Sequence, residues 1–218
     1  ASLKVDEFIR RSTEKAHVLK CDIKKFFNSI ETTKLFRILK RTISCKKTLN
    51  LIKKIILIRE KSLPIGTLTS QLFSNCFLNE LDHFLKDRKR IKLYCRYADD
   101  FVIVSKSKEF LHSLKELIEK FLIENLDLEL NKKTSIFPIR HGIDFCGFRS
   151  FRNHKKARKR VLKAAKLKSR KLLKKTNLTK QKVLGILGSF IGYVKHCNSK
   201  RSSKEIFDNF EKVLIKFA

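Results

Sequence analysis

Residues 92–104 read Lys92-Leu93-Tyr94-Cys95-Arg96-Tyr97-Ala98-Asp99-Asp100-Phe101-Val102-Ile103-Val104. Two short apolar segments flank a pair of adjacent aspartates, a pattern that predicts two strands joined by a tight turn at Asp99 and Asp100. The pair has two interpretations. Asp is common in turns because its side chain bonds nearby backbone. Alternatively, two carboxylates on a rigid hairpin tip form half of a divalent-metal site of the kind that phosphoryl transfer uses.

A third carboxylate is available near the start of the chain. The segment His17-Val18-Leu19-Lys20-Cys21-Asp22-Ile23 reads as a strand that ends at Asp22. If this strand neighbours the hairpin in one antiparallel sheet, then Asp22, Asp99 and Asp100 converge at the edge of that sheet. They would then hold two Mg²⁺ ions about 3.5–4 Å apart, and Mn²⁺ could substitute. Mg²⁺ prefers such oxygen ligands and keeps water and substrate phosphates as the others.

The charge balance points to a polyanionic partner. The chain has 52 Lys and Arg residues against 21 Asp and Glu, a formal net charge of +31. Repulsion on that scale disfavours a compact fold unless a polyanion neutralises it, and a phosphate backbone is the default partner ahead of an acidic membrane surface. Because no apolar run would span a bilayer and no signal peptide is recognised, we expect no membrane association and a cytoplasmic location.

Strands and helices alternate without a strict parallel repeat, which predicts the α+β class. Residues 128–137 and 143–151 are expected to be strands, paired around Arg140-His141-Gly142. After Phe151 the composition changes: thirteen of the 25 residues in 151–175 are Lys or Arg and none is acidic. Three helices are expected in this basic region. We therefore divide the chain into a domain at 1–150 and a basic helical module at 151–218.

The sequence resembles the reverse transcriptases, because five short motifs of that family occur here in its order. They are Asp22-Ile23-Lys24-Lys25-Phe26-Phe27 (motif A), Leu63-Pro64-Ile65-Gly66 with Ser70-Gln71 (motif B), Tyr97-Ala98-Asp99-Asp100 (motif C), Asn131-Lys132-Lys133-Thr134 (motif D) and Phe145-Cys146-Gly147-Phe148 (motif E). The resemblance implies a polymerase palm at 1–150, a thumb at 151–218, and RNA-directed DNA synthesis with an RNA template, a DNA or RNA primer and dNTPs. It also implies a bacterial or phage-like origin.

The resemblance also assigns roles to residues. Asp22, Asp99 and Asp100 would bind the metal ions together with the backbone carbonyl of Ile23, and Lys133 would protonate or neutralise the leaving pyrophosphate. The remaining roles fall into three groups. They are dNTP binding by Phe27 (a steric gate against the ribose 2′-hydroxyl), Ile65, Gly66 and Gln71; a primer grip of Phe145, Cys146, Gly147 and Phe148; and nucleic-acid backbone contacts by Lys155, Lys156, Arg158, Lys159 and Arg160.

Motif B carries the features that distinguish subfamilies. Ile65 and Gln71 are similar to those of the error-prone reverse transcriptases of diversity-generating retroelements, which work with a small basic accessory protein. A group II intron-like or phage-defence enzyme, or a non-catalytic palm–thumb fragment that only binds nucleic acid, are the alternatives. Only 21 residues precede Asp22, fewer than a fingers region needs. We therefore expect these 218 residues alone to bind nucleic acid but to polymerise poorly.

Overall fold

The computed structural model describes residues 1–57, 62–64, 66–175 and 178–217. The chain forms two compact units, one made of Arg10–Ile139 with Ala1 and the other of Ser2–Ile9 with the residues from Arg140 onward. None of the helices in the described ranges combines the length and the apolar character that a bilayer crossing requires.

The first unit is built on a four-stranded antiparallel sheet. Its strands are β1 (His17–Asp22), β2 (Tyr94–Tyr97), β3 (Asp100–Ser105) and β4 (Ser135–Pro138), in the spatial order β2-β3-β1-β4. Along the chain the order is β1, helices, β2, β3, helix, β4, which is the split βαβ arrangement of ferredoxin-like sheets. The predicted α+β class is therefore confirmed.

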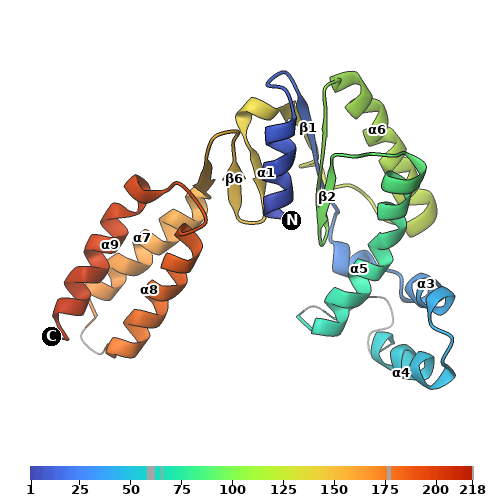
Figure 1. Cartoon of the computed structure of the whole chain (residues 1–218). Coiled ribbons are helices and arrows are strands. Elements are labelled where there is room, and N and C mark those ends of the chain that lie inside the picture. Colours follow the sequence, from blue (N-terminus) through green and yellow to red (C-terminus); the bar gives the residue numbers. More distant parts are fainter. Residues whose placement is uncertain (58–61, 65, 176–177, 218) are drawn as a thin grey trace. The chain divides into compact units, whose positions relative to one another are not determined.

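The helices α5 (Leu68–His83) and α6 (Lys108–Phe121) lie along one face of this sheet, and α3 (Thr32–Thr42) packs against α5 and α4 (Lys46–Ile56) (Figure 1). The short helix α2 (Phe26–Ser29) follows β1, and the π-helical turns η1 (Phe84–Arg88) and η2 (Leu122–Leu126) continue α5 and α6. Strand alternation turns Leu19 and Phe101 toward the helices, where they pack in one core with Phe77 of α5 and Ile118 of α6. All four side chains are fully buried, and each contributes about 1.5–3 kcal/mol by leaving water.

The second unit contains a small sheet and a three-helix bundle. Its elements are α1 (Ser2–Arg11, of which Ser2–Ile9 belong here), η3 (Ile139–His141, at the boundary), β5 (Ile143–Phe145), β6 (Phe148–Ser150), β7 (Lys155–Ala157), α7 (Lys159–Leu173), α8 (Lys180–Val194) and α9 (Lys200–Ile215). The strands pair in the order β5-β6-β7. Val183 of α8 with Ile206 and Val213 of α9 form the centre of the bundle core, each fully buried.

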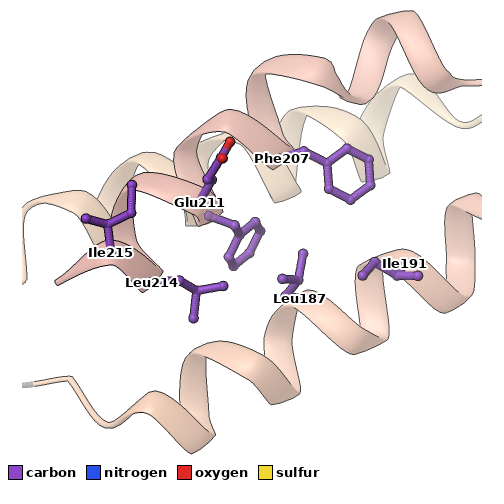
Figure 2. Close-up of a pocket in the computed structure, with 7 residues that line it drawn as sticks. Leu187, Ile191, Phe207, Glu211, Leu214 and Ile215 are labelled. Carbon is purple, nitrogen blue, oxygen red and sulfur yellow. The ribbon is translucent and has the colours of Figure 1, made fainter. Parts of the chain in front are cut away.

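An apolar hollow of about 450 Å³ opens between α8 and α9 (Figure 2). Its lining consists of Leu187, Ile191, Phe207, Phe210, Glu211, Leu214 and Ile215. Two of these side chains are well exposed, Ile191 at 46% and Ile215 at 66%. The hollow is therefore open to solvent where Ile191 and Ile215 lie.

Two strand predictions were wrong in detail. β4 pairs with β1 rather than with β5, and 143–151 folds back on itself as the β5–β6 hairpin. Residues 143–151 fold back because of the two-residue turn Cys146-Gly147, whose positive φ values of 47° and 91° are those of a type I′ hairpin turn. The turn between β2 and β3 is Ala98-Asp99, one residue earlier than predicted, because Asp100 already pairs with Tyr97.

Candidate active site

Two of the predicted carboxylates face each other across neighbouring strands. β1 and β3 are antiparallel, and their register sets Asp22, the last residue of β1, opposite Asp100, the first of β3. Residues in such a pair project from the same face, with Cβ atoms about 4.5–5.5 Å apart. The strands predicted to be neighbours are neighbours, and they bring Asp22 and Asp100 together at one end of the sheet.

The third carboxylate lies in the turn next to this pair. Asp99 follows Ala98, whose φ of 53° is in the left-handed region that residues with a β carbon seldom adopt. Burial raises the pKa of Asp99, and the negative charge of Asp22 raises it further, with a backbone hydrogen bond acting in the opposite direction. The charge of Asp22 therefore acts on Asp99 in the turn as well as on Asp100 in β3.

The environment of Asp100 disfavours the charged form of its carboxyl group. Burial raises the pKa of its carboxyl group; the ammonium of Lys20 lowers it, and the charges of Asp22 and Asp99 raise it again, for a net upward shift. Lys20 Nζ lies 3.6 Å from Asp100 Oδ2. These carboxylates repel each other in partial burial, and one lysine offsets only part of that repulsion.

The loop before β4 braces Asp22. Asn131 donates from its side-chain amide to Asp22 Oδ2 at 2.9 Å and from its backbone N–H to the Asp22 carbonyl at 2.7 Å. Lys24 N–H in turn donates to the Glu129 carbonyl, so that Ile23 pairs with Leu130 in an isolated bridge. In a bridge of this type the central residue's own carbonyl points away from its partner. The Ile23 carbonyl is therefore directed to the side of β1 on which β3 lies.

The donor set suits a hard divalent cation. Within residues 1–57, 62–64, 66–175 and 178–217, no group of three or more His, Cys, Asp or Glu side chains is arranged to hold a metal ion. The carboxylate oxygens of Asp22, Asp99 and Asp100 are nevertheless ligands of the type that Mg²⁺ selects. The raised pKa values of Asp99 and Asp100 mark charges that a cation would stabilise.

The predicted nucleotide-binding residues lie on two connected segments. Phe27 in α2 is half-buried, and its carbonyl accepts the N–H of Leu63 at 3.3 Å, which ties motif A to motif B. Gly66 has a φ of 93° and open space where a Cβ would stand. Gln71 is exposed in the first turn of α5. Ile65 lies outside the described residues.

Lys133 is exposed in a short turn before β4. Its N–H donates to the side-chain oxygen of Asn131 at 3.1 Å, and Thr134 N–H donates to the Asn131 carbonyl at 2.9 Å. The same asparagine therefore supports Asp22 and shapes the turn that carries the predicted general acid.

The predicted primer-grip hairpin is tied to the helical bundle within the second unit. Phe148 stacks on Tyr193 of α8 with ring centroids 4.8 Å apart, and the Tyr193 hydroxyl donates to the Gly147 carbonyl at 2.6 Å. The same hydroxyl accepts the backbone N–H of Arg158 at 3.2 Å. Phe145 is buried and Cys146 is half-buried. One tyrosine thus connects the hairpin turn, the start of α7 and α8.

The five residues predicted to contact the nucleic-acid backbone fall into two groups, one in ion pairs and one exposed to solvent. Lys155 Nζ pairs with Asp6 Oδ2 at 2.5 Å, and Arg158 Nε pairs with Asp144 Oδ1 at 2.5 Å. Lys156, Lys159 and Arg160 are exposed. Lys159 and Arg160 begin α7, where the positive end of the helix dipole disfavours cations. An anion at this position would relieve that repulsion.

The family model described as "Reverse transcriptase (RNA-dependent DNA polymerase)" matches residues 2–150, more than half of the sequence. The chain belongs to the reverse transcriptase family. It is 26% identical over 215 residues to the retron Ec73 reverse transcriptase of Escherichia coli, covering 89% of this chain and 66% of the relative. It is 29% identical over 178 residues to protein YkfC of Escherichia coli K12, covering 62% and 47%. The chain therefore spans about half to two thirds of the length of these relatives.

Two solved telomerase structures share the fold. Telomerase from Candida albicans, solved with a fragment of telomeric RNA, matches with a TM-score of 0.53 at 16% identity, over 97% of this chain and 42% of the other. Apo telomerase from Candida tropicalis matches with a TM-score of 0.55 at 12% identity, over 99% and 44%. At such low identity the likeness concerns the palm and thumb architecture alone.

Sequence reasoning on this reverse transcriptase chain missed four supporting residues: Lys20, Arg96, Asn131 and Tyr193. A signal existed for Arg96, because alternation from the buried Tyr94 puts a cation on the helix-covered face of β2, where it needs a partner. Lys20 similarly shares a face with Asp22, two residues away. Neither Asn131 nor Tyr193 carries a comparable signal, since their partners lie 109 and 46 residues away.

Proposed function

We propose that this chain is the palm and thumb of an RNA-directed DNA polymerase that extends a DNA or RNA primer with dNTPs on an RNA template. The observation that carries the proposal is the β1–β3 register, which sets Asp22 opposite Asp100 and beside the turn that holds Asp99. We assign residues 1–150 to the palm and 151–218 to the thumb. Membership of the reverse transcriptase family supports this assignment.

Two divalent ions, Mg²⁺ or Mn²⁺, would be held by the carboxylates of Asp22, Asp99 and Asp100 and by the Ile23 carbonyl. When bound, such ions activate the primer 3′-hydroxyl and stabilise the charge of the departing pyrophosphate. In the reaction the 3′-oxygen bonds to the α-phosphorus of the dNTP, the bond from that phosphorus to pyrophosphate breaks, and the hydroxyl proton passes to solvent water. The mutual repulsion of the carboxylates supports this role, since a cation would relieve it.

The chain's other residues would orient the substrates. Lys133, exposed on its turn, would give a proton or a positive charge to the pyrophosphate. Phe27 would exclude a ribose 2′-hydroxyl by occupying the space beneath the sugar, while Gly66 and Gln71 would border the nucleotide. The hairpin Phe145–Phe148 would support the primer end, and Lys156, Lys159 and Arg160 would contact phosphates. Lys155 and Arg158 would contribute by fixing the elements that carry these groups.

We further propose that the enzyme is the error-prone type of a diversity-generating retroelement, with a small basic accessory protein as partner. Ile65 and Gln71 support this subtype. Group II intron and retron reverse transcriptases usually carry Gln at the position of Ile65, and an apolar side chain there would remove a polar contact to the nucleotide and loosen its position. Replacing Ile65 with Gln and sequencing the cDNA tests the idea. Fewer errors opposite template adenine are expected; an unchanged error spectrum would count against this subtype and favour the group II intron-like or phage-defence alternative.

Two assays on the same protein test the polymerase proposal against the non-catalytic alternative. Primer extension on an RNA template with Mg²⁺ is measured for the 218 residues and for the complete product of the reading frame, alongside gel shifts with the same template–primer. We expect extension by the complete product, its loss on Asp22→Asn, Asp99→Asn or Asp100→Asn, and unchanged gel shifts, because the phosphate contacts come from Lys and Arg. Binding without extension by the complete product would instead identify a nucleic-acid-binding protein.

A further inference from the structure

Arg96 in β2 is a charged side chain on the helix-covered face of the sheet. Its side chain is 10% exposed and makes a two-point pair with Asp82 of α5, from Nε to Oδ1 at 2.9 Å and from Nη2 to Oδ2 at 2.6 Å. Burial opposes the charge of Arg96, but the hydrogen bonds and charge of Asp82 outweigh it and raise the pKa of the guanidinium. This pairing fixes the plane of the guanidinium against α5.

The third nitrogen of the same guanidinium reaches the turn between β2 and β3. Arg96 Nη1 donates to the Ala98 carbonyl at 3.0 Å and to Asn75 Oδ1 at 3.1 Å. Asn75 and Asp82 are seven residues apart on α5, so two helical turns of α5 are joined to one point of the turn. A planar guanidinium with five N–H groups can serve these acceptors at once.

The carbonyl that Arg96 holds belongs to the strained residue of the turn. Ala98 has a φ of 53°, and its carbonyl lies in the peptide group that continues to the Asp99 nitrogen. A non-glycine residue keeps such a backbone conformation only where neighbouring groups enforce it. The bond from Arg96 is therefore placed to determine where the Asp99 carboxylate stands.

We propose that Arg96 is a positioning residue that couples α5 to the Ala98-Asp99 turn, so that the placement of Asp99 depends on the helix whose first turn carries Gln71. The inference rests on the proposed function and adds to it. Gln71 of α5 is expected at the nucleotide, so movement of α5 there would be transmitted to the metal-binding turn. Arg96 itself contacts no reacting atom in this scheme.

The alternative is that Arg96 only stabilises the core, and Tyr94 offers a matched control. The buried Tyr94 donates its hydroxyl to Asp82 Oδ1 at 2.6 Å, on the same carboxylate that Arg96 binds. Tyr94→Phe therefore weakens the network around Asp82 while leaving the Arg96–Ala98 bond. Arg96→Lys keeps the charge but cannot pair with Asp82 and reach Ala98 together.

The coupling is tested by measuring the binding of Mn²⁺ alone, which does not require polymerisation. Calorimetry and the electron paramagnetic resonance signal of Mn²⁺ both report this binding. Arg96→Lys is expected to weaken Mn²⁺ binding about tenfold, as loss of a supporting contact does at other metal sites. Tyr94→Phe is expected to lower the melting temperature but to leave Mn²⁺ affinity within about twofold of wild type. Equal affinities of wild type and Arg96→Lys, or equal losses in Arg96→Lys and Tyr94→Phe, would overturn the inference.

Two further variants keep the test decisive. If Arg96→Lys does not fold, Arg96→Gln combined with Asp82→Asn removes the buried charge pair together with the bond to the Ala98 carbonyl. A weakened Mn²⁺ affinity in that folded double variant supports the coupling, and an unchanged affinity opposes it. Adding Ala98→Gly to Arg96→Lys should restore part of the affinity, because glycine adopts positive φ without strain; no restoration would oppose the proposed route through Ala98. Wild type that binds no Mn²⁺ would instead refute the metal site on which both proposals depend.

Discussion

Lys20 Nζ lies 3.6 Å from Asp100 Oδ2, and Asp100 stands opposite Asp22 in the pairing of β1 with β3. The ammonium lowers the pKa of Asp100. It therefore offsets part of the cost of burying the Asp100 charge and part of the repulsion from Asp22 and Asp99. A metal ion bound by Asp100 would meet this same ammonium as a like charge. Lys20 therefore stabilises the metal-free site and competes with the cation that the site is proposed to bind.

Replacing Lys20 with Gln should strengthen metal binding. Removing one positive charge beside a divalent ion is expected to lower the half-saturating Mn²⁺ concentration about threefold to tenfold at low salt, with a smaller effect at high salt. Titration of Mn²⁺ at two ionic strengths measures this. Lys212→Gln, which removes an exposed cation from α9, is the control for net charge. Weaker Mn²⁺ binding in Lys20→Gln would mean that Lys20 orients Asp100 rather than competing for it.

Asp100→Asn should make the metal-free protein more stable while abolishing the proposed activity. The pKa of Asp100 is raised on folding, so the folded state binds more protons than the unfolded state just above the ordinary pKa of Asp. The stability that protonated Asp100 contributes is therefore lost as pH rises from the ordinary pKa of Asp through the raised pKa of the folded state. At neutral pH the folded protein carries the disfavoured charged form. Replacing the charged carboxylate of Asp100 with the neutral amide of Asn should raise the melting temperature of the metal-free protein by about 1–3 °C at pH 7.

Melting curves recorded between pH 4 and 8 without metal check this expectation. The gain from Asp100→Asn should shrink toward the acidic end, where the wild-type carboxyl is itself protonated. Asp208→Asn on α9 removes an exposed carboxylate from the other unit and serves as the control. A lower melting temperature at pH 7 for Asp100→Asn would show that the pair with Lys20 outweighs the repulsion.

The convergence of Asp22 and Asp100 was predictable, because local patterns mark both strands. Apolar alternation locates β1 and the β2–β3 hairpin, and only the assumption that the strands are neighbours was needed to bring the carboxylates together. The partner of β4 was predicted wrongly for a related reason. Alternation identifies a strand without naming its partner, and 118 residues separate His17 from Ser135 along the chain, so no local signal favoured the β1–β4 pairing.

The supporting contacts were harder to predict because they depend on how elements pack. Arg96 meets Asp82 and Asn75 only because α5 lies against the sheet in one rotation, which the helical periodicity of α5 alone does not determine. In the same way, a count of basic residues could not show that Lys155 pairs with Asp6, which lies near the opposite end of the sequence. Charge patterns predict a partner class, whereas individual ion pairs require the packed structure.

Acid should weaken the helical bundle through Glu205. The pKa of this carboxyl is lowered by hydrogen bonds from Lys166 and then Arg170, so Glu205 joins two turns of α7 to α9. A carboxyl with a lowered folded-state pKa stabilises the fold above its ordinary pKa, and this contribution is lost as pH falls through the lowered value. Glu205→Gln should therefore lower the bundle's stability at pH 7 and flatten its acid dependence.

Hydrogen exchange in α7 and α9 at pH 7 and pH 3.5 checks the Glu205 prediction. Protection is expected to fall in the variant at pH 7, and the difference from wild type is expected to shrink at pH 3.5. Glu211→Gln, on the same helix beside the apolar hollow, is the control (Figure 2). A variant that loses protection equally at both pH values would assign the effect to packing rather than to the carboxylate charge.

Tyr193→Phe should loosen the predicted primer grip without affecting metal binding. The change keeps the ring that stacks on Phe148 but removes the hydroxyl that bonds Gly147 and Arg158. Each lost hydrogen bond is worth about 1 kcal/mol, so the unfolding free energy of this unit should fall by about 1–2 kcal/mol. If the hairpin supports the primer end, template–primer should dissociate faster, while Mn²⁺ affinity stays that of wild type.

Ser189→Ala, which removes an exposed hydroxyl from the same helix, is the matched control for Tyr193→Phe because its hydrogen bond stays within α8. The dissociation rate of a labelled template–primer and hydrogen exchange at Gly147 are measured for both variants. Faster exchange at Gly147 with an unchanged dissociation rate would show that the hairpin is held by Tyr193 but does not hold the primer. Faster dissociation in Tyr193→Phe alone would place the grip where the hairpin, α7 and α8 meet.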